Sequence, residues 1–235
     1  MKHKLIYFFI IILLLFLIYI FRNTVKNLFF ASKEKQTIES IIKKYNTQVF
    51  KSLNNNFTET EINPSSYEVA ILAFKKEQIL EVYVRKTVNS NWKFLKKYSF
   101  TAFSGNIGPK LNNGDRQIPE GIYKMEYLNP NSLYHLSIKV SYPNSFDKEK
   151  AGKDGRLDLG GDIMIHGKNV TIGCIPIGDK NIEELFILAA KANNKNFPII
   201  IAPQDFRVNR SFPKVDSIDW ENELYTNIEN ELKKY

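Results

Sequence analysis

Residues 160–179 read GGDIMIHGKNVTIGCIPIGD and contain Cys174, the one cysteine of the 235-residue chain. A lone thiol cannot form an intramolecular disulfide or a multi-cysteine metal site, so Cys174 is either core packing or a nucleophile. The neighbouring residues favour the nucleophile. Gly173 lets the backbone approach a substrate closely, and amide N–H groups at such a turn can face a developing oxyanion. His166, eight residues before the cysteine, is the nearest base.

The composition indicates one folded domain with additions. With 43% hydrophobic residues, a chain of 235 residues can bury one ordinary core. The net charge is +8, but residues 1–35 hold six basic residues and one acidic residue, which leaves only +3 for the other 200. No later stretch combines clustered Lys and Arg with stacking aromatic residues. A nucleic-acid partner is therefore not expected.

An unbroken apolar run covers residues 5–21, LIYFFIIILLLFLIYIF, which is 17 residues without a charge. This length is at the lower limit for crossing a bilayer, and we expect a transmembrane anchor after a short tail at 1–4. A cleaved signal peptide is the competing interpretation, but no small-x-small cleavage pattern follows before Ala31. More basic residues follow the run than precede it, so the positive-inside rule taken alone favours a cytoplasmic domain.

The rest of the chain divides by its hydrophobic period. A helical stalk and linker are predicted over residues 22–66, with an amphipathic helix at 37–53 and a polar, turn-rich loop at 54–66. A helix is expected at 182–192 behind a cap at Asp179 or Asn181, and a C-terminal amphipathic helix within 209–235 behind a cap at Asp216 or Ser217. Strands are predicted at 67–74, 79–86, 92–103, 121–127, 133–142, 163–166 and 198–202. The first three are expected to be antiparallel neighbours.

Two features outside the cysteine motif are candidates for substrate contact. The segment 104–121 concentrates Gly, Pro and Asn over eighteen residues, and a loop this long in a compact domain is usually functional or disordered. It contains Lys110 and Arg116. His135 alternates against the aliphatic row of its predicted strand, so it either lines a groove or meets solvent.

The motif at 160–179 resembles that of the bacterial L,D-transpeptidase catalytic domain, the YkuD type, and most closely its YafK-like branch. The segments FSGNIGPKLNNGDRQIPEGIY (103–123) and YHLSIKVSYPNSFD (134–147) resemble the stretches that precede the motif there. The matched pieces occur in order and cover roughly residues 67–205. The sequence departs from the wider family at Ile172 and Pro176, where that family has His and Arg.

The resemblance implies a mainly β fold with a few helices (α+β), an L,D-transpeptidase-like β-sandwich or barrel over residues 67–208, preceded by the N-terminal anchor. It implies that Cys174 is the nucleophile and His166 the general acid and base. A thiolate near an imidazolium would have a lowered pKa. Three further positions are expected to form the oxyanion hole or its turn: Gly167, Thr171 and Gly173. Lys110, Arg116 and His135 are the candidates for substrate binding, the first two in place of the absent arginine.

The implied substrate is a peptidoglycan stem peptide, acylated onto Cys174 at meso-diaminopimelate and passed to an amine, which could be a protein lysine. If water resolves the acyl-enzyme instead, the protein is an L,D-carboxypeptidase or an endopeptidase. A non-catalytic wall-binding module is the alternative from another class. Such a substrate favours a single-pass protein of the bacterial cytoplasmic membrane with its catalytic domain outside the cytoplasm. No cofactor or metal is expected, because thiolate chemistry needs none and HExxH is absent.

Overall fold

The computed structural model describes residues 12–22 and 35–235 and divides the chain into two units, residues 1–36 and 37–235. In the first unit, residues 12–22 are helical. Residues 5–11 of the predicted anchor lie outside the described residues. In the described parts of the chain, no helix is both long enough and apolar enough to cross a membrane.

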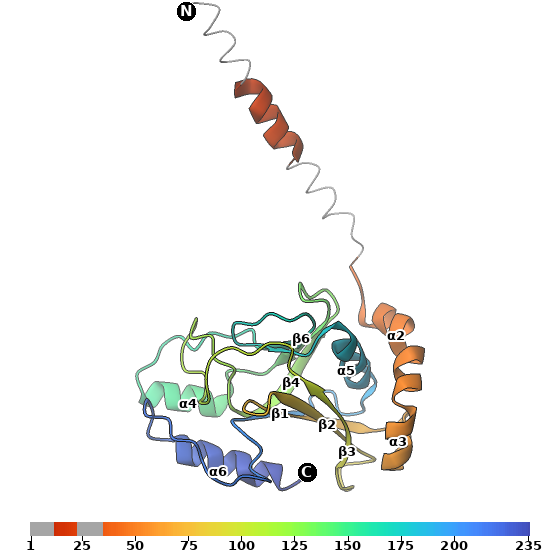
Figure 1. Ribbon diagram of the computed structural model, residues 1–235, viewed down its shortest axis with the longest axis vertical. Helices are drawn as coiled ribbons and strands as arrows, with labels where there is room; N and C mark the ends of the chain where they lie inside the picture. Colours follow the sequence, from red (N-terminus) through yellow and green to blue (C-terminus); the bar gives the residue numbers. More distant parts are fainter. Residues whose placement is uncertain (1–11, 23–34) are drawn as a thin grey trace, which may run out of the picture. The chain divides into compact units, whose positions relative to one another are not determined.

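The second unit is built on one curled, eight-stranded mixed sheet (Figure 1). Its strand order is β3-β2-β1-β8-β4-β5-β6-β7, with parallel pairs at β1–β8 and β6–β7. The bounds are β1 Glu68–Phe74, β2 Ile79–Arg85, β3 Lys93–Ser99, β4 Gly121–Asn129, β5 Ser137–Val140, β6 Met164–His166, β7 Ile175–Pro176 and β8 Pro198–Ala202.

This architecture confirms the expected α+β class, with one curled mixed sheet in the place of the expected β-sandwich or barrel. The strand order ends at β3 on one side and β7 on the other, so the sheet does not close into a barrel. β4 joins the two halves: it pairs with β8 near its start and with β5 further along, with a register shift between Met125 and Leu128. Such an irregularity increases local bend and twist, which is how the sheet curls.

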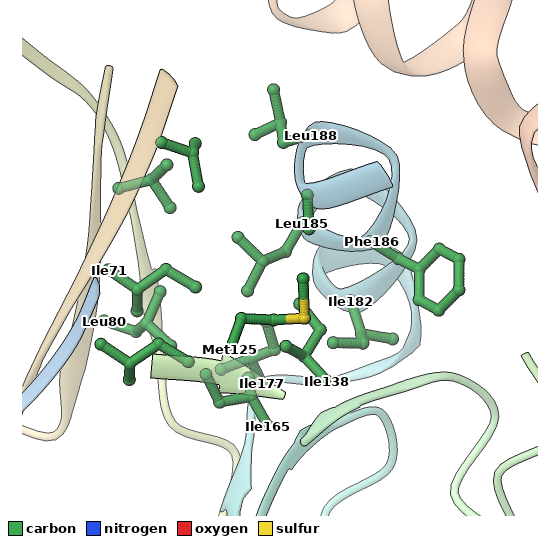
Figure 2. Close-up of a cluster of buried hydrophobic side chains, with 14 of the residues drawn as sticks. Ile71, Leu80, Met125, Ile138, Ile165, Ile177, Ile182, Leu185, Phe186 and Leu188 are labelled. Carbon is green, nitrogen blue, oxygen red and sulfur yellow. The ribbon is translucent and has the colours of Figure 1, made fainter. Parts of the chain in front are cut away.

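Alternate side chains of a central strand point to opposite faces of the sheet, and both faces are apolar. Val69, Ile71 and Ala73 of β1 belong to one buried cluster, whereas Ala70, Leu72 and Phe74 belong to a second one. The first cluster packs under helix α5 (Asp179–Lys191), whose Ile182, Leu185 and Leu188 face the sheet (Figure 2). The second packs under helix α6 (Glu221–Leu232). A sheet buried on both faces needs a helix on each side.

Helix α2 (Ile38–Ser52) follows the predicted helical period and belongs to the compact unit. Thr37 caps it with a capping box, and its buried face, Ile41, Tyr45 and Val49, joins the core that lies under α5. The polar stretch 54–66, expected to be a linker or loop, contains helix α3 (Asn54–Thr60), because its Phe57 is buried in that core. The start of the folded unit therefore moves from residue 67 to Thr37.

Helix α4 (Ser145–Lys153) has no counterpart among the predicted elements, because it carries little apolar periodicity and depends on the Asn144 capping box. The expected helix caps also shift. α5 begins at Asp179 behind Gly178, and α6 begins at Glu221 behind Trp220. The strand expected over 133–142 shortens to β5 because His135 has a φ of +77°, which is incompatible with extended backbone.

Candidate active site

The short parallel strands β6 and β7 carry the candidate catalytic residues. Ile165 pairs with Ile175, and His166 pairs with Pro176. Paired residues share a face of the sheet, as do alternate residues along a strand. Cys174 lies in the bend directly before β7, two residues before the Pro176 that pairs with His166. The eight-residue spacing in the sequence is thus the length of the turn that joins two adjacent strands.

The turn before Cys174 is closed by a threonine hydroxyl and a glycine. The Thr171 Oγ1 donates to the Cys174 carbonyl oxygen at 2.7 Å and accepts from the Gly173 N–H at 3.1 Å. Gly173 has a φ of +132°, and a Cβ there would lie 3.0 Å from the Gln117 carbonyl oxygen. Because its N–H is occupied by Thr171, Gly173 is not a free oxyanion donor. The Cys174 N–H, in contrast, has no acceptor in the described part of the chain.

The Cys174 thiol is half-buried and contacts backbone. Its Sγ atom donates to the Asp162 carbonyl oxygen at 3.5 Å. Burial raises the pKa of the thiol above its ordinary value, while the Met164 backbone N–H and the Lys139 ammonium group act in the opposite direction. Cys174 is therefore a neutral thiol at rest.

The His166 imidazole is buried, with 1% of its surface exposed. Its Nδ1 lies 2.5 Å from the Gly167 carbonyl oxygen, which can only accept, so Nδ1 carries the proton and Nε2 is left as the acceptor. The Tyr134 ring covers it with the ring centres 4.6 Å apart. Burial lowers the pKa of His166, which makes the resting ring neutral. Both directions are opposite to those expected for a thiolate–imidazolium pair.

Gly167 supports the histidine and has no room for a side chain. A Cβ at this position would lie 2.5 Å from Asp179 Oδ1 and 2.8 Å from the Tyr134 carbonyl oxygen. The same Asp179 oxygen accepts from the Lys168 N–H at 2.8 Å. The glycine therefore positions the His166 end of the turn, and its own carbonyl oxygen sets the tautomer.

Two buried lysines contribute positive potential at Cys174. Lys110, which the sequence predicted as a substrate-binding residue, is 6% exposed, and its Nζ lies 2.6 Å from Asp115 Oδ1. Lys139, 7% exposed and absent from the predicted site, lies 3.0 Å from Asp162. Both lower the pKa of the Cys174 thiol, although burial outweighs them. Lys139 of β5 pairs with Met164 of β6. In the sequence, Lys139 alternates with the apolar Ile138 and Val140, and this pattern is the signal that could have identified it.

The other two predicted binding residues lie differently. Arg116 is exposed, with a φ of +59°, and forms no ion pair with the described residues. His135 turns toward the helices: its Nε2 lies 2.7 Å from Glu183 Oε1 on α5, and its ring meets Tyr45 of α2 edge-on. The contacts of His135 account for its position without a substrate.

The loop at 104–121 is anchored by a buried ion pair that the sequence pattern did not indicate. Lys75 and Glu120 are fully buried and lie 2.9 Å apart. The Lys75 Nζ also donates to the carbonyl oxygens of Gly108 and Ile118, at 2.7 and 2.8 Å. Glu120 accepts from the Tyr225 hydroxyl of α6 at 2.9 Å. The network fixes both ends of the segment that carries Lys110 and lies against Gly173.

No group of three or more His, Cys, Asp or Glu residues placed to hold a metal occurs within 12–22 and 35–235. A histidine on β6 and a cysteine directly before the neighbouring strand β7, whose own backbone N–H has no acceptor among the described residues, are the residue types of a cysteine nucleophile site. The comparisons with known proteins identify the family. The family model of the YkuD L,D-transpeptidase catalytic domain matches residues 68–201, so the chain belongs to that family.

The chain is 35% identical over 120 residues to "Putative L,D-transpeptidase YafK" of Escherichia coli K12, which covers 50% of this chain and 46% of that protein. It thus spans about half the length of the curated relative. Among solved structures, Pgp2 of Campylobacter jejuni, described as a helical cell shape determining protein, has a TM-score of 0.48 at 18% identity and covers 77% of each chain. L,D-transpeptidase 1 of Mycobacterium tuberculosis has a TM-score of 0.34 at 14% identity, and the match covers 58% of this chain and 62% of that chain.

Proposed function

We propose that the protein is a peptidoglycan-acting cysteine acyltransferase that forms a thioester between Cys174 and a stem peptide at meso-diaminopimelate. The observation that carries the proposal is the Nδ1 contact of His166 with the Gly167 carbonyl oxygen, because it leaves Nε2 unprotonated as a base, on a strand whose neighbour β7 begins directly after Cys174. The family of the domain supplies the substrate class.

In the acylation half-reaction, His166 Nε2 takes the proton of the Cys174 thiol as sulfur attacks the peptide carbonyl carbon. The S–C bond forms, and the carbonyl oxygen becomes an oxyanion that the Cys174 N–H stabilises. The C–N bond then breaks, and the imidazolium returns its proton to the departing amine, which leaves as the terminal D-amino acid. Because thiol and imidazole are both neutral at rest, proton transfer accompanies attack rather than preceding it.

Lys139 and Lys110 are suited to the carboxylates of the stem. Both ammonium groups are buried and lower the pKa of Cys174, so their positive potential reaches the reacting sulfur. The carboxylate that pairs with Lys139 belongs to Asp162, whose side chain is 93% exposed. A pair with one solvated partner is weak, and a substrate carboxylate can replace Asp162. We expect Lys139→Met to raise KM for the stem by about tenfold, with a smaller effect on kcat.

In the second half-reaction an amine attacks the thioester carbonyl, the C–S bond breaks, and the thiol regains its proton. A second stem peptide as the amine gives a 3-3 cross-link, and a protein lysine gives an attached protein. The substrate lies outside the cytoplasm, so the catalytic domain is proposed to lie there too, held at the cytoplasmic membrane by residues 5–21.

The test uses the full chain with a purified disaccharide-tetrapeptide, followed by intact mass. The expected result is a protein adduct with the mass of the substrate minus alanine, absent in Cys174→Ala and slowed about 10²-fold or more in His166→Gln. Dimeric products establish the transpeptidase, whereas disaccharide-tripeptide alone identifies the carboxypeptidase. Turnover retained in full by Cys174→Ala would refute Cys174 as the nucleophile. No adduct and no turnover with the wild type would refute the acyltransferase and leave the non-catalytic wall-binding role.

A further inference from the structure

A groove of about 500 Å³ lies between α6, the start of α4 and the start of β4. It includes neither Cys174 nor His166. Its volume is in the range of sites that hold small ligands or segments of a polymer. The groove belongs to the face of the sheet that α6 covers, where Leu224 and Ile228 also join the buried cluster.

The chemistry of the lining is that of a neutral, amphipathic ligand. Apolar surface comes mainly from Ile122 and Phe146, because Leu224 and Ile228 behind them are only 4% and 0% exposed. The two charged side chains in the lining, Glu231 and Lys234, lie 2.6 Å apart and neutralise each other. Neither an anionic nor a cationic ligand gains a net counter-charge here.

The remaining polar groups are carboxamides and one hydroxyl. Asn144, Asn227, Asn230 and Ser145 line the groove. The Asn144 side chain is occupied, because it caps α4 and donates to the Ile122 carbonyl oxygen. Asn227 and Ser145, by contrast, make no side-chain hydrogen bond within the described parts of the chain. An asparagine amide both donates and accepts, so it can bind the hydroxyl and acetamido groups of a sugar.

We propose that this groove binds the N-acetylated glycan strand of peptidoglycan at a site separate from the catalytic cysteine. The inference rests on the proposed function, which supplies a glycan-linked substrate. The apolar wall contacts the C–H faces and acetamido methyl groups of the sugar, while Asn227, Asn230 and Ser145 hydrogen-bond to its polar edges. The site holds the polymer while the stem peptide reaches Cys174.

Two asparagines of the same helix provide a matched test. Asn227 and Asn222 are both exposed on α6, but only Asn227 lines the groove. Asn227→Trp fills the groove, and Asn222→Trp makes the same chemical change outside it. Both variants are made in the full chain, and thermal unfolding checks that each one folds.

The probe is a β-1,4-linked N-acetylglucosamine tetramer, which carries no peptide, and its binding is measured by calorimetry. The expected result is saturable binding that Asn227→Trp weakens about tenfold or more and Asn222→Trp leaves unchanged. Cellotetraose, which lacks the acetamido groups, is expected to bind more weakly. No saturable binding, equal loss in both variants, or equal affinity for cellotetraose would overturn the proposal.

A separate measurement keeps this proposal distinct from the proposed function. Acylation of Cys174 by a free tetrapeptide without sugar does not use the groove, so Asn227→Trp is expected to leave it unchanged. If the peptide acylates Cys174 but the tetramer does not bind, only the glycan site is refuted. If the tetramer binds but no peptide acylates the enzyme, only the acyltransferase proposal fails.

Discussion

The buried pair of Lys75 and Glu120 leads to a prediction whose magnitude follows from its contacts. Lys75→Met removes three interactions of one ammonium group, those with the Gly108 and Ile118 carbonyl oxygens and with Glu120 Oε1. Glu120 keeps the Gly108 N–H and the Tyr225 hydroxyl as donors, at 2.7 and 2.9 Å, but loses its cationic partner. The variant therefore leaves a carboxylate in a site with no exposed surface.

Breaking a buried ion pair from one side typically costs about 3–5 kcal/mol, because the remaining charge is not solvated. For a folded unit of this size, each kcal/mol corresponds to roughly 2–4 °C in Tm, so Lys75→Met is expected to lower Tm by about 6–20 °C. The double variant Lys75→Met/Glu120→Gln removes both charges. It is expected to recover at least half of the lost free energy of unfolding, because a neutral amide is less costly to bury.

The assay is urea unfolding of the full chain, followed by circular dichroism, for the wild type, both single variants and the double variant. The four free energies form a double-mutant cycle that isolates the coupling between the two side chains. A loss below about 1 kcal/mol in Lys75→Met, or a double variant as unstable as the sum of the singles, would refute the reasoning. Either result would mean that the loop at 104–121 is held by other contacts.

Three further predictions concern the catalytic turn. Because burial raises the pKa of the Cys174 thiol, its rate of alkylation by iodoacetamide should keep rising with pH beyond the ordinary value of 9.0, and a plateau near pH 7 would contradict the neutral resting site. Thr171→Val removes the hydroxyl that joins the Gly173 N–H to the Cys174 carbonyl oxygen and should slow acylation about tenfold, whereas Thr171→Ser should retain it. Gly173→Ala puts a Cβ 3.0 Å from the Gln117 carbonyl oxygen at a φ of +132°, so thermal unfolding should show a loss of about 1–3 kcal/mol together with lost acylation; an unchanged Tm would show that the turn is not strained.

The sequence was sufficient where the signal is local. Period 2 over residues 67–74 and 79–86 predicted β1 and β2 within a residue or two, because side chains of alternate residues must enter opposite faces of a buried sheet. The helix at 182–192 followed from its apolar stripe in the same way. The order of the motifs, with Gly and Cys a short distance after His and Gly, indicated the family that the family model matches.

Other features depend on residues far apart in the chain. Helix α4 has almost no apolar periodicity and follows from the Asn144 capping box, and α3 owes its burial to Phe57 in the core. The single curled sheet arises because β8, the last strand in the chain, inserts between β1 and β4. No local pattern specifies that neighbour relation.

By itself, the sequence determined the types of most elements and the family, and it singled out the candidate cysteine and histidine, since each depends on residue chemistry or on short-range spacing. Only the tertiary structure decided the electrostatic state of the site. Burial makes both Cys174 and His166 neutral at rest, which reverses the expectation from their proximity in sequence. The pairing of β5 with β6 and of β6 with β7 also places Lys139 close enough to lower the pKa of the Cys174 thiol. Desolvation and cross-strand register are properties of the packed sheet, and they exist only once the chain has folded.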